Sequence, residues 1–123
     1  MEPIATSENQ ITFIYNGETS VGKQAFGYIK SAKSKVHSIN TAKDNFTIKQ
    51  WAGLAEKLDL QAEDLISQQH PDFINKYGTN RDLQTIDWLK IIVKKPQLIK
   101  WSILIRGNSY FKISDPSDVI RYL

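Results

Sequence analysis

The chain of 123 residues contains no cysteine, and this absence removes several kinds of chemistry at once. Without a thiol there are no disulfides, no thiolate nucleophile and no cysteine ligands for zinc. Histidine is scarce as well: only His37 and His70 are present, and their spacing matches no zinc-binding motif. His70 precedes a proline and is expected in a loop, whereas His37 is expected on a short, partly buried strand. The sequence therefore predicts no metal site and no other cofactor.

Long apolar runs are missing too. No run approaches the roughly 18 residues that a membrane span requires, and residues 1–10 lack the basic and apolar regions of a signal peptide. We expect a disordered lead-in over residues 1–10, a cytoplasmic location and no membrane partner. The excess of positive charge is only +3, with basic residues in short, scattered runs that are typical of solvated faces. A nucleic-acid partner is therefore not indicated.

The overall composition is ordinary for one globular domain, with 41% hydrophobic and 24% charged residues. Apolar residues predict a strand over residues 11–15, a helix from Val21 to Ala32 and a second strand over residues 36–39. A right-handed crossover through the helix would make the two strands parallel. Val21 and Tyr28 are assigned to the apolar face of the helix.

The middle of the chain is expected to be helical. Thr47 and Gln50 have the spacing of a capping box, which predicts a helix from residue 48, followed by a helical turn over residues 61–66. A further helix is predicted over residues 82–93, with Ile86 on its buried face and with Lys94 and Lys95 at the negative end of its dipole. The polar segment between these helices, interrupted by proline and glycine, is expected to be irregular.

Two strands close the chain, over residues 101–105 and 110–113, and a helix capped by Asp115 follows them. The order β-α-β, helices, β-β-α predicts an α/β fold of the thioredoxin-like or glutaredoxin-like class. Its mixed sheet has about four strands flanked by helices. We expect one domain over residues 11–123, with the helical region at about 45–95 as an insertion.

The stretch "NGETSVGKQA" is close to a P-loop, because Gly17 and the pair Gly22-Lys23 match G-x-x-x-x-G-K. Gln24 stands where the magnesium-binding hydroxyl is required, and no apolar strand ends in the aspartate that would supply a second magnesium ligand. Nucleotide binding at residues 17–23 is therefore the minor alternative.

Three segments resemble the ArsC/Spx family, which comprises glutaredoxin-coupled arsenate reductases and their regulatory relatives. "ITFIYNGETSVGKQAFGYIK" is similar to the family's first strand, active-site loop and first helix. "TIKQWAGLAEKLDLQAEDLIS" is similar to its middle helices, and "KKPQLIKWSILIRGNSYFKISDPSDVIRYL" to its closing hairpin and helix. The resemblance covers residues 11–123 and implies the same thioredoxin-like fold.

At the positions that the resemblance assigns to catalysis, the chain departs from the family. Thr19 stands at the nucleophilic cysteine, Ser67 at an oxyanion-binding arginine, and Trp101-Ser102 at an Arg-Pro pair. A further family arginine falls near Ser114. A hydroxyl cannot replace a thiolate in arsenate reduction, so thiol-dependent arsenate reductase activity is excluded. A cis peptide bond at Ser102 is not expected either, because the family's proline is missing.

These substitutions favour a non-catalytic binding or regulatory module with an unidentified protein partner. The resemblance offers a precedent, since the Spx branch binds RNA polymerase through protein contacts. The alternative is a small-anion-binding protein or an atypical enzyme that uses the start of the first helix. There, free amides from Thr19 to Gly22 are expected beside Lys23. No catalytic residue is assigned, and the ligand-binding candidates are Thr19, Ser20, Gly22, Lys23, Ser67, Trp101 and Ser102.

Overall fold

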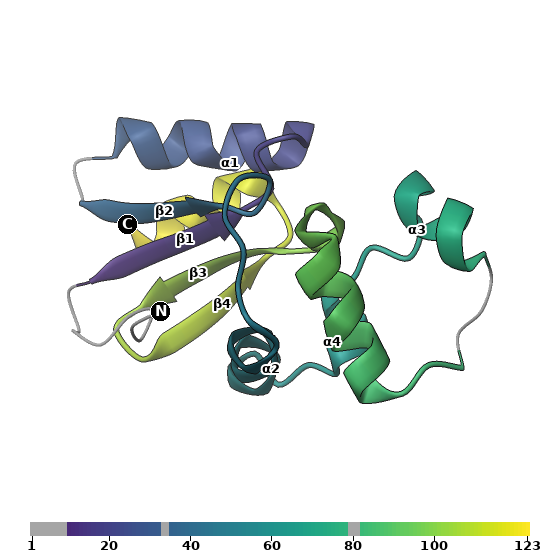
Figure 1. Ribbon diagram of the computed structural model, residues 1–123. Coiled ribbons are helices and arrows are strands. Elements are labelled where there is room, and N and C mark those ends of the chain that lie inside the picture. Colours follow the sequence, from purple (N-terminus) through teal and green to yellow (C-terminus); the bar gives the residue numbers. More distant parts are fainter. Residues whose placement is uncertain (1–9, 33–34, 79–81) are drawn as a thin grey trace. The chain divides into compact units, whose positions relative to one another are not determined.

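A computed structural model describes residues 10–32, 35–78 and 82–123, which divide into two compact units. The first unit combines residues 1–44 with residues 101–123, and the second comprises residues 45–100. Figure 1 shows the elements of each unit along the chain. The expected lead-in lies outside the described residues except for Gln10, and the expectation of a single domain remains a prediction.

The first unit is built on a four-stranded mixed sheet of order β2-β1-β3-β4. Its strands are β1 (Ile11–Tyr15), β2 (Val36–Asn40), β3 (Ser102–Arg106) and β4 (Ser109–Ile113). The pair β1–β2 is parallel, whereas β1–β3 and β3–β4 are antiparallel. Gly107 adopts a φ of 61° in the tight turn between β3 and β4, a conformation that favours glycine. The fold class and the parallel first pair predicted from the sequence are confirmed.

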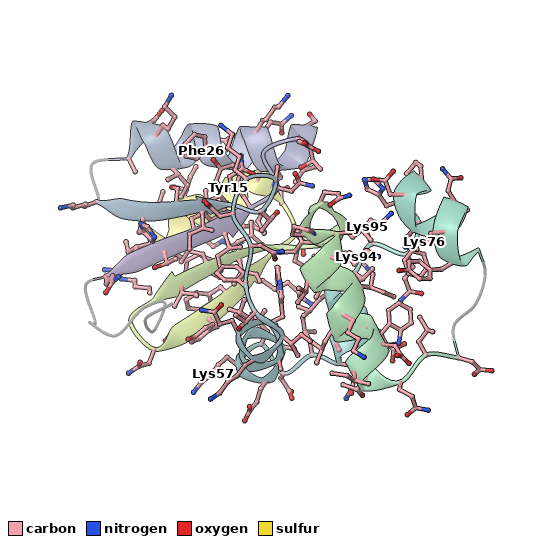
Figure 2. All side chains as sticks on the ribbon, viewed as in Figure 1. Tyr15, Phe26, Lys57, Lys76, Lys94 and Lys95 are labelled. Atoms are coloured by element: carbon pink, nitrogen blue, oxygen red, sulfur yellow. The ribbon has the colours of Figure 1, made fainter. Side chains whose placement is uncertain are left out.

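Helix α1 (Ser20–Ser31) and the 3₁₀ segment η3 (Pro116–Tyr122) pack together in this unit. The residues of the core share one face of the sheet and the inner sides of the two helical segments: Ile11, Phe13, Tyr15, Ala25, Ile29, Leu104, Ile113 and Val119. Ring stacking continues this core outward, since Tyr15 lies 4.8 Å from Phe26 between ring centroids (Figure 2). Burial of Tyr15 raises the pKa of its phenol.

The second unit contains α2 (Ile48–Lys57), η1 (Ala62–Leu65), α3 (Pro71–Tyr77), α4 (Thr85–Lys94) and η2 (Pro96–Leu98). The predicted capping box starts α2: the Thr47 hydroxyl accepts from the Gln50 amide, and the Gln50 side chain accepts from the Thr47 amide. Trp51 and Trp88 are buried. The Phe73 ring stacks on the Trp88 ring at 5.7 Å, which holds α3 against α4.

Several local expectations were wrong. The polar segment after residue 67 contains α3, because the side chain of His70 caps this helix by accepting from the Asp72 amide. His37 is exposed on its strand. Val21, Tyr28 and Ile86 were placed on buried faces but are 49%, 42% and 45% exposed. Helical spacing identified the helices, yet apolar residues at the margin of each stripe lie outside the core.

None of the described helices is long and apolar enough to span a membrane. The described parts of the chain also contain no cis peptide bond and no cluster of three or more side chains that could hold a metal ion.

Candidate functional site

The loop that joins β1 to α1 brings together four of the candidate residues: Thr19 ends the loop, and Ser20, Gly22 and Lys23 follow in the first turn of α1. The loop follows the end of β1 and lies beside the end of the parallel strand β2. Two asparagines organise it: Asn16, which directly follows β1 and is buried, and Asn40, which is the last residue of β2. Thr41 ties the two strand ends together, because its amide donates to the Tyr15 carbonyl at 2.8 Å.

The asparagine side chains take up amides that an anion-binding loop would direct at its ligand. The amide of Gly17 donates to Asn40 Oδ1 at 2.8 Å, and that of Glu18 to Asn16 Oδ1 at 2.9 Å. The Thr19 amide donates to the Asn16 carbonyl at 3.3 Å. A phosphate cradle requires such groups to be available. Here they already have acceptors within the protein.

Thr19, which the resemblance assigns to the position of the nucleophilic cysteine, caps α1. Its Oγ1 accepts from the Gly22 amide at 3.0 Å and donates to the Asn16 carbonyl at 3.0 Å. The Thr19 carbonyl accepts from the Lys23 amide at 3.0 Å. The hydroxyl is thus used as both acceptor and donor, in the ordinary role of an N-cap threonine. The sequence-based expectation of free amides at Thr19 and Gly22 was wrong for this reason.

Both glycines of the P-loop-like motif have a structural reason to be glycine. A Cβ added to Gly22 would lie 2.0 Å from the Asn16 carbonyl oxygen, and one added to Gly17 would lie 2.4 Å from Asn40 Nδ2. Neither position can hold a side chain without movement of its neighbours. The match to a P-loop is therefore accounted for by close packing between the ends of two parallel strands and the first turn of a helix.

Few hydrogen-bond donors at this loop remain available to an anion. Ser20 and Val21 open the helix, and amides in the first turn have no intrahelical acceptor. The side chain of Lys23 is exposed. An anion could meet two amides and one ammonium group here, without a buried charged partner.

Ser67 belongs to the second unit. Its amide donates to the Leu98 carbonyl at 2.7 Å, beside an antiparallel bridge between Ile66 and Ile99. Ser67 lines an open, polar pocket of about 350 Å³. The other polar side chains of this pocket include Glu63, Asp64, Gln68 and Lys100. Both signs of charge meet there, but no guanidinium, which is the group that recognises an oxyanion by paired hydrogen bonds.

Trp101 and Ser102 lie at the start of β3 in the first unit. Ser102 is buried and pairs with Ile113 across the hairpin. Trp101 is half-buried, and Lys112 Nζ lies 4.7 Å from the centroid of its ring. This is a cation–π contact. It gives the indole a local partner within the sheet unit, and the candidate ligand-binding role of both residues remains a prediction.

The structure groups Thr19, Ser20, Gly22 and Lys23 at one loop and describes Ser67 with the other unit. Asn16 and Asn40 were missed by the sequence reasoning although they determine the loop's chemistry. The only signal was an asparagine just after, or at the end of, each predicted strand, where a short amide side chain can bond to nearby backbone groups.

No protein-family model matches the chain, and no curated protein matches it. Solved structures do match. An arsenate reductase from Vibrio cholerae superposes with a TM-score of 0.78 at 12% identity, over 93% of this chain and 98% of that one. An arsenate reductase candidate from Yersinia pestis gives 0.78 at 15% identity, over 91% and 99%. An ArsC-related protein from Brucella melitensis gives 0.68 at 11% identity, over 92% and 93%. At these identities the matches establish the fold, which is that of the arsenate reductases.

Proposed function

We propose that this chain is a divergent, cysteine-less relative of the arsenate reductases that acts as a non-catalytic protein-binding module. One observation carries the proposal. At the loop where the fold would hold its nucleophile and its oxyanion, the Thr19 hydroxyl caps α1 and the amides of Gly17, Glu18 and Thr19 bond to acceptors within the protein. The fold is retained while its chemistry is closed off.

The position of Thr19 argues against catalysis of another kind. A threonine nucleophile needs a base that removes its proton. The hydroxyl proton of Thr19 instead points to the Asn16 carbonyl oxygen, 3.0 Å away, which is not a base at ordinary pH. The loop therefore supports a role in which the protein binds a partner through its surface. A cytoplasmic location is part of this proposal.

Binding of a small anion at the start of α1 is the second candidate. The amides of Ser20 and Val21, with the exposed Lys23, favour it. Such a site lacks a buried charged group, so it would hold an anion weakly and in competition with water.

Two experiments test the proposal. The first, on the purified chain, follows arsenate reduction with glutathione and glutaredoxin, together with thermal unfolding in rising concentrations of arsenate, phosphate and sulfate. We expect no turnover and no shift of Tm that differs from a matched chloride series. Turnover, or a Tm that rises with arsenate in wild type but not in a Lys23→Ala variant, would replace the proposal by the anion-binding or enzymatic alternative.

The second measurement looks for the partner itself. The tagged chain is crosslinked in its native host and purified under denaturing conditions. We expect one protein to be recovered in stoichiometric amount, and the absence of any such protein would count against a binding module.

A further inference from the structure

Helix α4 presents an unusual surface in the second unit. Ile86, Lys90 and Lys94 recur every four residues, so they line one face of the helix. Ile86 is 45% exposed, although it is a large apolar residue in a unit that buries its other helical isoleucines on α4. The repeated lysines are a like-charge pair at i and i+4, which destabilises an isolated helix slightly. This face therefore exposes apolar area at Ile86 and positive charge at Lys90 and Lys94. Among the described residues, no carboxylate forms an ion pair with either lysine.

Beside this face lies a pocket of about 250 Å³. Its apolar lining comes from Tyr77, Leu83 and Ile91, and its charged lining from Asp87, Lys90 and Lys94. Pockets for drug-sized ligands or cofactors generally start at about 300 Å³. The volume is therefore suited to one bulky side chain of a bound peptide. The ammonium groups of Lys90 and Lys94 lie beside it, where they could pair with acidic residues that flank this side chain.

Lys76, from the last turn of α3, adds to the positive charge. Figure 2 shows its side chain directed toward Lys94 and Lys95. The Lys94 ammonium lowers the pKa of Lys76 from its ordinary value, through charge repulsion first and then a side-chain hydrogen bond, with a smaller effect of Lys95. In the described parts of the chain, none of these three lysines forms an ion pair with a carboxylate.

Among the described residues that line the pocket, Asp87 is the one carboxylate, and it takes part in a helix cap. Asp87 Oδ2 accepts from the Gln84 amide at 3.0 Å and so caps the start of α4. Asp72 Oδ2, on α3, accepts from Gln97 Nε2 at 3.3 Å and lies 3.9 Å from His70 Nδ1. Asp87 thus shares the pocket with Lys90 and Lys94, but in the described parts of the chain neither acid forms an ion pair with a lysine of this cluster.

The helix dipoles do not account for the cluster alone. Lys76 and Lys94 lie in the last turns of α3 and α4, where a single cation is favourable. That argument explains each lysine separately. It does not explain why two ammonium groups approach each other closely enough to repel, since the partial charge at a helix end is about half an elementary charge and is screened by solvent.

We propose that the lysine face of the second unit, defined as Lys76, Lys90, Lys94 and Lys95 with the Tyr77–Leu83–Ile91 pocket, binds an acidic peptide segment of a partner protein. A bulky apolar side chain of the segment enters the pocket, and its flanking carboxylates pair with the lysines. The inference rests on the proposed binding function and names the chemistry of the partner.

The test uses the purified chain and a fluorescein-labelled heptapeptide with a central phenylalanine between two groups of three glutamates. Fluorescence anisotropy is expected to show saturable binding that weakens as salt rises, because the contacts are charged. The double variant Lys76→Glu/Lys94→Glu should bind at least about tenfold more weakly. The control Lys49→Glu/Lys57→Glu changes net charge equally at two exposed lysines of α2, one of which, Lys57, is labelled away from the cluster in Figure 2, and should bind like wild type.

Changes in the peptide keep the test independent of protein folding. Replacement of the central phenylalanine by alanine should weaken binding about tenfold, and a peptide with lysine for every glutamate should not bind. The proposal is overturned if the acidic peptide does not bind or if the double variant binds it as well as the control. Tighter binding of a single-stranded oligonucleotide than of the peptide would overturn it too.

These outcomes can be separated from those of the proposed function. If crosslinking recovers a partner whose capture survives Lys76→Glu/Lys94→Glu, the module stands and the lysine face is the wrong surface. If no partner is recovered while the peptide binds as expected, the surface stands and the proposed function falls.

Discussion

The β1–α1 loop and the lysine face treat their polar groups in opposite ways. In the loop, the amides of Gly17, Glu18 and Thr19 each have an acceptor within the protein, and the Thr19 hydroxyl both donates and accepts. On the lysine face, ammonium groups of Lys76 and Lys94 lie close enough to repel, and no described carboxylate pairs with either. Satisfied polar groups stabilise the chain that holds them, whereas unmatched charges favour a ligand of opposite sign.

This comparison suggests which region of the protein binds a partner in a chain that has no cysteine for thiol chemistry. In the β1–α1 loop of this chain, the Thr19 hydroxyl caps α1 and the amides of Gly17 and Glu18 bond to asparagine side chains. The lysine face lies instead on the inserted helices, where sequence reasoning assigned only a structural role. Lys76 Nζ lies 5.9 Å from the centroid of the Tyr77 ring, and no carboxylate of the described residues pairs with Lys76 or Lys94.

Gly22→Ala gives the largest effect that we expect. The added Cβ would meet the Asn16 carbonyl oxygen at 2.0 Å, so the first turn of α1 must move away from the loop. We predict a loss of about 2 to 3 kcal/mol in the free energy of unfolding, as for other overpacked sites, measured by urea denaturation. A variant as stable as wild type would show that the loop is not closed as described.

Thr19→Ala removes the hydroxyl that joins Asn16 to Gly22. We expect a loss of about 1.5 kcal/mol, the usual range for an N-cap threonine, in the same denaturation experiment. Thr19→Ser keeps the hydroxyl and serves as the matched control, with stability near that of wild type. Equal stability of all three proteins would contradict the cap and reopen a functional role for this hydroxyl.

Gly27→Ala, in the same helix, should have the opposite sign. Apart from its chain neighbours and the backbone of its own helix, no described atom lies within 4 Å of the position of its Cβ, and the residue is exposed in the middle of α1. Alanine is favoured over glycine in a helix by about 1 kcal/mol, so the variant should be more stable by that amount. The same substitution at two glycines of one helix then separates close packing from helix propensity. A destabilised Gly27→Ala variant would mean that the helix has a different exposed face.

The smallest effect concerns protonation on the lysine face. Because Lys94 repels it, Lys76 should lose its proton below the ordinary pKa of 10.5. A lowered pKa in the folded state means that the unfolded chain binds more protons in the interval below 10.5, so the repulsion destabilises the fold at neutral pH and is relieved as pH rises through that interval. NMR titration of the lysine side chains checks this, and Lys94→Gln should return the pKa of Lys76 toward its ordinary value. An unchanged titration in that variant would argue against the cluster.

Much of the fold could be predicted from the sequence. The alternation of strands and helices, the capping box at Thr47 and the two closing strands depend on local patterns, and the structure has each of them. Helix α3 could not be found in this way, since it is short and its cap is a histidine side chain, which is an unusual N-cap residue. The exposure of Val21 and Ile86 was not predicted either. Helical spacing shows which residues share a face of the helix, but not how much of that face the rest of the protein covers.

The candidate sites were predictable only in part. The loss of the thiol follows directly from composition, and the position of Thr19 from the resemblance to a family. The engagement of the loop amides by Asn16 and Asn40 depends on two residues 24 positions apart, which only the parallel pairing of β1 and β2 brings together. The approach of Lys76 to Lys94 depends likewise on how α3 packs on α4 through Phe73 and Trp88.

The most direct test is a pair of NMR titrations on the ¹⁵N-labelled chain, one with phosphate and one with the acidic phenylalanine peptide. With the peptide, we expect chemical-shift changes confined to α3, α4 and the Tyr77–Leu83–Ile91 pocket. With phosphate, the amides from Gly17 to Lys23 should not shift beyond a matched chloride control. Saturable phosphate shifts at Thr19 to Lys23, together with an α4 surface that ignores the peptide, would contradict the account by showing that recognition still resides in the loop of the arsenate reductase fold.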